Sequence, residues 1–132
     1  MVAWRRLENP HGMAIALMNG GTILINMGRD EEAHPLLVEA QTLFKEVGDL
    51  YFYSITLVHL GNVALGLGKI DEALAWLEEA HALSRKVGEG WAISFALNNL
   101  GEVARVQGNY ELARSYYEES EALLRAMGDT GD

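Results

Sequence analysis

Residues 61–89 read GNVALGLGKIDEALAWLEEAHALSRKVGE, and residues 101–129 read GEVARVQGNYELARSYYEESEALLRAMGD. A third version of the same pattern, GTILINMGRDEEAHPLLVEAQTLFKEVGD, occupies residues 21–49. The segments start at residues 21, 61 and 101, so the period is 40 residues both times and no gap is needed. A fixed period of this size is typical of proteins built from stacked structural units, each packed on its neighbours.

Each unit is predicted to contain two helices. In the middle unit these span roughly residues 50–67 and 70–87, and Ala73, Leu77 and Ala80 follow the i, i+4, i+7 spacing of one helical face. Glycine accepts the left-handed conformation that ends many helices. We therefore expect helix ends at the recurring glycines, which are Gly28, Gly68 and Gly108 within units and Gly48, Gly88 and Gly128 between them.

Small residues also recur where the two helices of a unit should face each other. They are Gly21, Gly61 and Gly101 on the first helices and Ala33, Ala73 and Ala113 on the second. Without bulky side chains at these places, the helix axes can approach to the short end of the usual range of about 8–10 Å. Nothing in the sequence favours strands, so the fold class is predicted to be all-α, a solenoid of antiparallel helix pairs.

The domain organisation is predicted to be one repeat domain over residues 1–132, with units at about 10–48, 50–88 and 90–128. Both ends look cut, because residues 3–7 align with residues 43–47 and the final GDTGD matches the opening of a fourth unit. Arrays normally close with polar capping elements. We therefore expect a fragment of a larger protein, or an array that self-associates through its uncapped ends.

The recurring positions resemble the tetratricopeptide repeat, whose pattern runs W-x2-L-G-x2-Y, then A-x3-F, then a late proline. The middle unit fills the six places before the proline with Leu57, Leu60, Gly61, Ala64, Ala73 and Leu77. The third unit fills them with Leu97, Leu100, Gly101, Ala104, Ala113 and Tyr117. The late proline is missing, and the first unit has Gly20 where leucine is expected. The resemblance implies a right-handed superhelix.

The long unit of 40 residues is similar to arrays in bacterial LuxR-type and AfsR-type regulators. There such arrays join a nucleotide-binding switch to a DNA-binding domain. Similar units occur in kinesin light chains and in the spindle-orientation adaptors. The resemblance implies a non-catalytic protein–protein interaction module whose partner is a protein or peptide, and a fragment of a bacterial transcriptional or signalling regulator.

The resemblance also implies a concave groove lined by the first helix of each unit. Carried over by position, the groove residues are Ile15, Met18, Thr22, Ile25 and Asn26 in unit one, Ile55, Val58, Asn62 and Leu65 in unit two, and Phe95, Asn98, Glu102 and Arg105 in unit three. Chaperone-docking members hold a terminal carboxylate with lysine, arginine and asparagine, and here only Asn62 fits that clamp. We expect instead an apolar groove centred on Met18, Val58 and Leu65, with a polar end in unit three.

Composition excludes several other classes of partner. Nineteen acidic residues against ten basic ones give a net charge of −9, which disfavours direct binding to nucleic acid or to an anionic membrane. No apolar run reaches the roughly 18 residues of a membrane span, and the N-terminus does not read as a signal peptide. We expect a cytoplasmic protein, and the absence of cysteine excludes thiolate metal sites and disulfides.

No motif indicates an enzyme, a metal site or a cofactor. The histidines form no HExxH pair, and His59, inside an apolar helix, is interpreted as a satisfied packing residue. The string GLGKID at residues 66–71 resembles a phosphate loop but has Ile70 where serine or threonine is needed. The paired Glu78 and Glu79 recur at the repeat period, as a solvated helix face would.

Two questions stay open from the sequence. The first helix of unit two is apolar nearly all round, and such a helix either is covered by its neighbours or offers a hydrophobic site to a partner or to a second copy of the chain. The alternative function is a ligand-sensing regulatory domain that holds a small effector or peptide in the concave groove.

Overall fold

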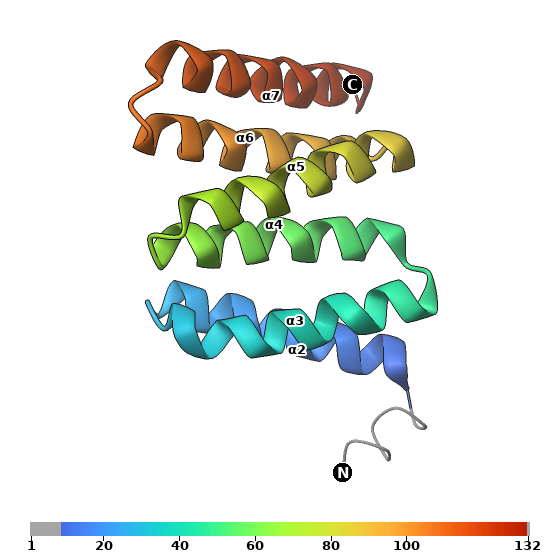
Figure 1. The fold of residues 1–132 in the computed structure, drawn as a ribbon. Coiled ribbons are helices and arrows are strands. Elements are labelled where there is room, and N and C mark those ends of the chain that lie inside the picture. The colour runs from blue at the N-terminus through green and yellow to red at the C-terminus, as the bar shows by residue number, and fades with distance from the viewer. Residues whose placement is uncertain (1–8, 132) are drawn as a thin grey trace.

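A computed structural model of the chain describes residues 9–131, with side chains up to residue 128. Within that range the backbone forms six α-helices and no strand. They are α2 (Pro10–Asn26), α3 (Asp30–Val47), α4 (Leu50–Gly66), α5 (Ile70–Val87), α6 (Gly90–Val106) and α7 (Tyr110–Gly131). Figure 1 shows that successive helices run back and forth and stack in chain order. The predicted all-α helical repeat solenoid is confirmed.

The helices pack as three hairpins, which are α2 with α3, α4 with α5, and α6 with α7. The second helix of one hairpin then packs against the first helix of the next, so α3 contacts α4 and α5 contacts α6. The first helices also touch one another, α2 with α4 and α4 with α6. They therefore lie along one face of the stack, which is the face where a shared groove can form.

Glycine ends the helices as predicted at five of the six expected places. Gly48 and Gly88, which follow α3 and α5, have φ of 80° and 82°. Gly28, Gly68 and Gly108, between the helices of each hairpin, have φ from 76° to 83°. An L-residue there would be strained by its Cβ, so these turns require glycine.

The prediction for Gly128 is wrong, because α7 runs through it to Gly131. At Gly48 the left-handed turn is held by a backbone hydrogen bond from the next residue, Asp49, to the carbonyl of Phe44 (3.0 Å), and α4 follows at once. After Gly128, α7 continues for three more described residues.

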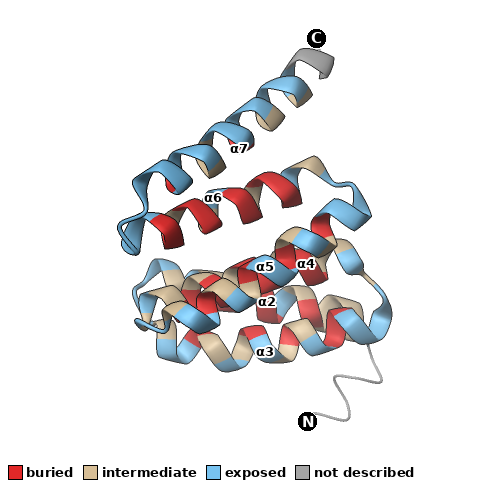
Figure 2. Ribbon diagram, turned by 45° about the horizontal axis from the view of Figure 1, so that its top comes forward, coloured by how far each residue is buried: buried red, intermediate tan, exposed pale blue. Residues whose placement is uncertain are grey.

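The core runs continuously through the stack. Its fully buried large side chains lie at matching places in successive units, among them Leu37 and Leu77 on the second helices and Leu57 and Leu97 on the first. Figure 2 shows buried residues concentrated where helices face one another, with exposed residues on the outer sides and over most of α7. Gly20 does not interrupt α2, although leucine is expected at that place in the repeat.

Two further expectations concern the N-terminal residues and membrane-spanning helices. The partial helix predicted over residues 3–7 lies outside the described residues. In the part that the structure describes, no helix is long and apolar enough to cross a bilayer.

Candidate functional site

The structure places the predicted groove residues along α2, α4 and α6, but with very different exposure. Three are exposed, namely Asn26, Asn98 and Arg105. Eight are half-buried, namely Ile15, Thr22, Ile25, Ile55, Asn62, Leu65, Phe95 and Glu102. The remaining two, Met18 and Val58, are buried.

Met18 and Val58 are buried, although the apolar groove was predicted to be centred on them and on Leu65, which is half-buried. Met18 is 7% exposed and Val58 is 1% exposed, and both belong to the hydrophobic core. α4 has helices packed on several sides, α3, α5 and α6 above all, so its nearly all-round apolar surface is used in the stack. The neighbours therefore cover most of this helix, and Val58 offers nothing to a partner.

An accessible hollow of about 460 Å³ lies instead between units two and three. Its walls come from α4, α6 and α7, and its lining residues are Ile55, His59, Trp91, Ser94, Phe95, Asn98 and Leu124. The sequence prediction contains Ile55, Phe95 and Asn98. His59 is neutral near pH 7, and no other lining residue carries a formal charge. The hollow is therefore uncharged and mostly apolar.

Trp91 is the residue of this hollow that sequence reasoning missed most clearly. It stands near the start of α6 and is 64% exposed, although indole is among the largest apolar side chains. Helical spacing supplies the signal that could have found it, because position 91 lies four residues before Phe95 in α6 and so shares its helical face. Leu124 was missed because it lies on a second helix and reaches the hollow from α7.

His59 packs against Phe95, which lines the same hollow. Its ring meets Phe95 edge to face, with centroids 5.3 Å apart. The expected packing role is therefore observed, but the side chain has no hydrogen-bond partner among the described residues. Burial away from water lowers the pKa of His59 to about 4, so the imidazole is neutral near pH 7.

A pair of buried hydroxyls joins α6 to α7 beneath this hollow. The Oγ atoms of Ser94 and Ser120 lie 2.6 Å apart, and Ser120 also donates to the backbone carbonyl of Ser94 at 3.2 Å. Both residues are at most 2% exposed. Because a buried hydroxyl needs a partner, this pair fixes the position of α7, and with it Leu124, relative to Trp91.

At the predicted polar end in unit three, the polar side chains form hydrogen bonds with one another. Arg105 donates to Glu102 at 2.9 Å, and the hydroxyl of Tyr117 donates to the same carboxylate. The Arg105 bond, followed by the Tyr117 bond, lowers the pKa of Glu102. The charges of Glu102 and Arg105 therefore balance each other, which leaves little net charge for a ligand at this end.

Among the described residues, no group of three histidine, aspartate or glutamate side chains is placed to hold a metal ion. The phosphate-loop-like string at residues 66–71 forms the turn between α4 and α5. Its lysine, Lys69, directly precedes α5 and makes no side-chain bond that caps that helix.

Stacked helix hairpins with their first helices along one face define the class of helical-hairpin repeat proteins. The family pattern described as tetratricopeptide repeat matches residues 12–86 and again residues 52–126. The chain therefore belongs to the tetratricopeptide repeat family, whose members are generally non-catalytic scaffolds for protein interaction.

A solved structure shows the same fold. The crystal structure of the tetratricopeptide repeat domain of Arabidopsis FLU superposes with a TM-score of 0.79 and 20% sequence identity, covering 89% of this chain and 98% of that domain. At that identity the likeness establishes the fold alone. No curated protein sequence matches the chain.

Proposed function

We propose that this chain is a non-catalytic interaction scaffold that holds a peptide segment of a partner protein between α4 and α6. The segment inserts an apolar or aromatic side chain into the hollow lined by Ile55, His59 and Phe95. The observation that carries the proposal is Trp91, which is 64% exposed at the edge of an uncharged hollow of about 460 Å³.

The energetics favour an apolar anchor. Covering the exposed part of Trp91 removes apolar surface from water, at about 25 cal/mol per Å². Tryptophan is among the residues that most often dominate binding energy at protein interfaces. The neutral imidazole of His59 carries no charge to desolvate, so an apolar side chain can enter without leaving a buried ion behind.

The charge of the chain favours basic residues beside that anchor. With 19 acidic and 10 basic residues, the chain attracts a positively charged segment over a range of about a Debye length. This long-range attraction acts mainly on the association rate. The partner segment is therefore expected to combine one large apolar side chain with flanking lysine or arginine.

The regulator context is part of this proposal and rests on the unit length. Units of 40 residues are similar to those of bacterial LuxR-type and AfsR-type regulators, so we propose that the array belongs to a cytoplasmic regulator of that kind. Sequencing the gene on both sides of this segment tests it. A flanking nucleotide-binding or DNA-binding domain supports the context, and flanking domains of a different class contradict it.

Selection of displayed peptides on the 132-residue chain tests the binding function, with affinities then measured by titration calorimetry. Selected peptides are expected to share an apolar anchor and to lose at least about tenfold in affinity with Trp91→Ala and with Phe95→Ala. The matched control is Met27→Ala, since Met27 is 58% exposed but lies away from the hollow.

Two results would contradict the proposal. One is a set of peptides whose affinities are the same for the Trp91→Ala chain as for the unchanged chain. The other is a thermal-shift screen in which only small metabolites raise the melting temperature, because a ligand specific for the native state must raise it. The second result would favour an effector-sensing domain.

A further inference from the structure

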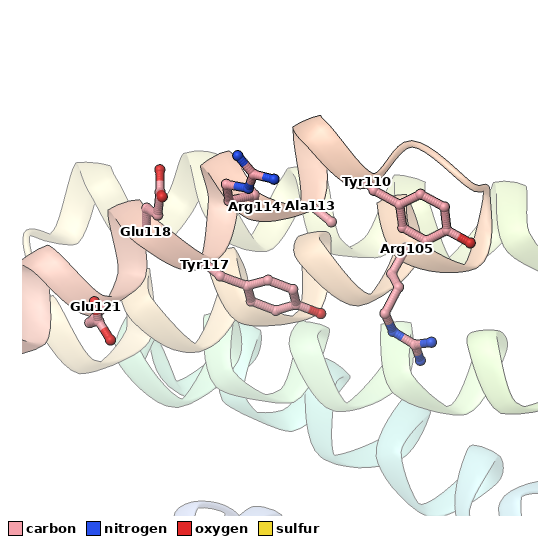
Figure 3. Close-up of a pocket in the computed structure, with 7 residues that line it drawn as sticks. All are labelled: Arg105, Tyr110, Ala113, Arg114, Tyr117, Glu118 and Glu121. Atoms are coloured by element: carbon pink, nitrogen blue, oxygen red, sulfur yellow. The ribbon is translucent and has the colours of Figure 1, made fainter.

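The outer face of α7 is the one long helix face of this stack that the described residues leave open on the C-terminal side. The next hairpin packs on α3 and on α5, and Leu37 and Leu77, which contact the first helix of their own hairpin, are fully buried in the stack. On α7 the equivalent residue, Tyr117, is only half-buried. Figure 3 shows this face, where a hollow of about 300 Å³ lies beside Tyr110, Arg114 and Tyr117.

The residues on this face differ in character from those that earlier units bury. In α5, which packs on α6, these places hold Ile70, Leu74, Leu77 and His81. In α7 the same places hold Tyr110, Arg114, Tyr117 and Glu121. Two large aromatic side chains thus alternate with one cation and one anion.

Three charged residues of α7 line this hollow, namely Arg114, Glu118 and Glu121, and of these Arg114 and Glu121 are too far apart to neutralise each other within one chain. Arg114 and Glu121 are seven residues apart, so their backbones are separated by about 10 Å along the helix axis. Glu121 accepts from Arg125 at 3.0 Å in an exposed pair one helical turn away. Arg114 has no ion pair with any described residue.

Antiparallel pairing of α7 with a second α7 brings these charges together. If the two-fold axis passes between Tyr117 and Glu118, then Arg114 of each copy lies opposite Glu121 of the other. The pairing is reciprocal, as the interface of a symmetric dimer requires. It produces two ion pairs, and it places the two Tyr117 side chains at the centre of the contact.

We propose that this chain forms a two-fold symmetric dimer through the outer faces of α7, held in register by reciprocal Arg114–Glu121 ion pairs. The flanking Tyr110 and the central Tyr117 supply the apolar contact area. Aromatic residues and arginine are enriched in protein interfaces for this reason. The dimer leaves the hollow beside Trp91 on α6 accessible, so both copies keep the proposed peptide site.

The competing arrangement is head-to-tail stacking of two copies, which gives Arg114 no acidic partner. It would place the outer face of α2 on α7, and that face presents Ala16, Ile23 and Met27. Ile23 and Met27 are each 58% exposed and carry no charge. Arg114, which has no ion pair with a described residue, would then be covered by apolar surface, and that is costly. Head-to-tail contacts also generate open filaments instead of a closed dimer.

Charge reversal across the interface is the decisive experiment. The unchanged chain, measured by light scattering after gel filtration at tens of micromolar, is expected at about twice its monomer mass of 14.5 kDa. Arg114→Glu and Glu121→Arg should each raise the dimer dissociation constant at least about tenfold, because each places like charges opposite one another. The double variant should return to within about threefold of the unchanged chain.

The matched control reverses a charge pair that is remote from α7. Arg29 and Glu32 form an exposed ion pair at the start of α3, and Arg29→Glu with Glu32→Arg should leave the mass unchanged. Circular dichroism of every variant verifies that the helices are intact. Neither Arg114 nor Glu121 lines the hollow beside Trp91. The dimer can therefore prove absent while peptide binding persists, and peptide binding can prove absent while the dimer forms.

Three results would overturn the dimer. The unchanged chain could remain a monomer at hundreds of micromolar. A dimer could form that neither single reversal weakens, or that the double reversal does not restore. Finally, the mass could grow beyond a dimer with concentration and be reduced by Ile23→Glu, which would establish head-to-tail stacking.

Discussion

A Cβ atom on Gly61 would lie 2.6 Å from Cγ of Leu77, closer than real Cβ contacts come. Gly21 has the same relationship to Leu37, and Gly101 has it to the ring of Tyr117. In each hairpin the first helix therefore approaches the second so closely that hydrogen alone fits between backbone and side chain. This confirms why the repeat keeps glycine at residues 21, 61 and 101.

Gly61→Ala is therefore expected to destabilise the fold by about 1–3 kcal/mol, the usual effect of overpacking a dense core. In a Leu77→Ala background the same change should be much less harmful, because the colliding side chain has gone. Urea denaturation of the four chains of this cycle measures both effects. Equal costs of Gly61→Ala in the two backgrounds would contradict the steric explanation.

Gly128→Ala serves as the control for that substitution. Gly128 lies within α7, and a Cβ there would meet nothing within 4 Å. Alanine is favoured over glycine inside a helix by up to about 1 kcal/mol. We expect this variant to be neutral or slightly more stable.

The sequence allowed the fold to be predicted closely because the signals that define it are local and repeated. Glycine with positive φ recurs at Gly28, Gly68 and Gly108, and the close contact of Gly61 with Leu77 recurs in every unit. Gly128 shares the sequence signal of Gly48 but not its structure. In the described chain Gly128 lies within α7, which continues to Gly131.

The groove was predicted less well, because exposure depends on how neighbouring units meet. Val58 and Asn98 occupy equivalent positions, yet Val58 is buried and Asn98 is exposed. The repeat period indicates which residues are equivalent but not which of them the neighbouring helices cover. His59 and Trp91 line the hollow only because α4, α6 and α7 meet there, and no pattern within one unit contains that information.

The N-terminus of α4 provides a second test of local stability. Asp49 accepts a hydrogen bond from the backbone N–H of Phe52 at 3.0 Å and lies 2.7 Å from Nε2 of His11. Asp49→Ala removes both contacts and should lower the free energy of unfolding by about 1–2 kcal/mol. Asp49→Asn keeps an oxygen for the cap, so it should cost less than half as much. Denaturation midpoints of both variants decide whether the cap explains the loss.

The serine pair between α6 and α7 should behave non-additively. Ser120→Ala leaves the Ser94 hydroxyl without this partner, and Ser94→Ala leaves the Ser120 hydroxyl only its bond to the backbone carbonyl of residue 94. Each change should cost about 1 kcal/mol. The double variant removes both hydroxyls and should cost less than the sum of the single changes. If the two costs simply add, the hydroxyls do not stabilise each other.

The stability of the chain should depend on pH through His59. The pKa of its imidazole is lowered to about 4 in the fold by burial, against 6.5 for the ordinary side chain. The unfolded chain therefore binds the proton more readily, so the fold is destabilised as pH falls from about 6.5 towards 4. Each pKa unit corresponds to about 1.4 kcal/mol, so this residue should account for a loss of about 2 kcal/mol between pH 7 and pH 5.

His59→Gln isolates that contribution, because glutamine is polar, of similar size and does not titrate. Other groups also titrate over this range, so the decisive quantity is the difference in pH dependence between the two chains. Urea denaturation at several pH values should show the unchanged chain losing about 2 kcal/mol more than the variant on acidification. No acidic side chain lines the hollow to stabilise a charged imidazole, so protonation of His59 disfavours the fold. Identical pH profiles for the two chains would mean that water reaches the ring well enough to keep its ordinary pKa, and that the hollow is more open than its lining residues indicate.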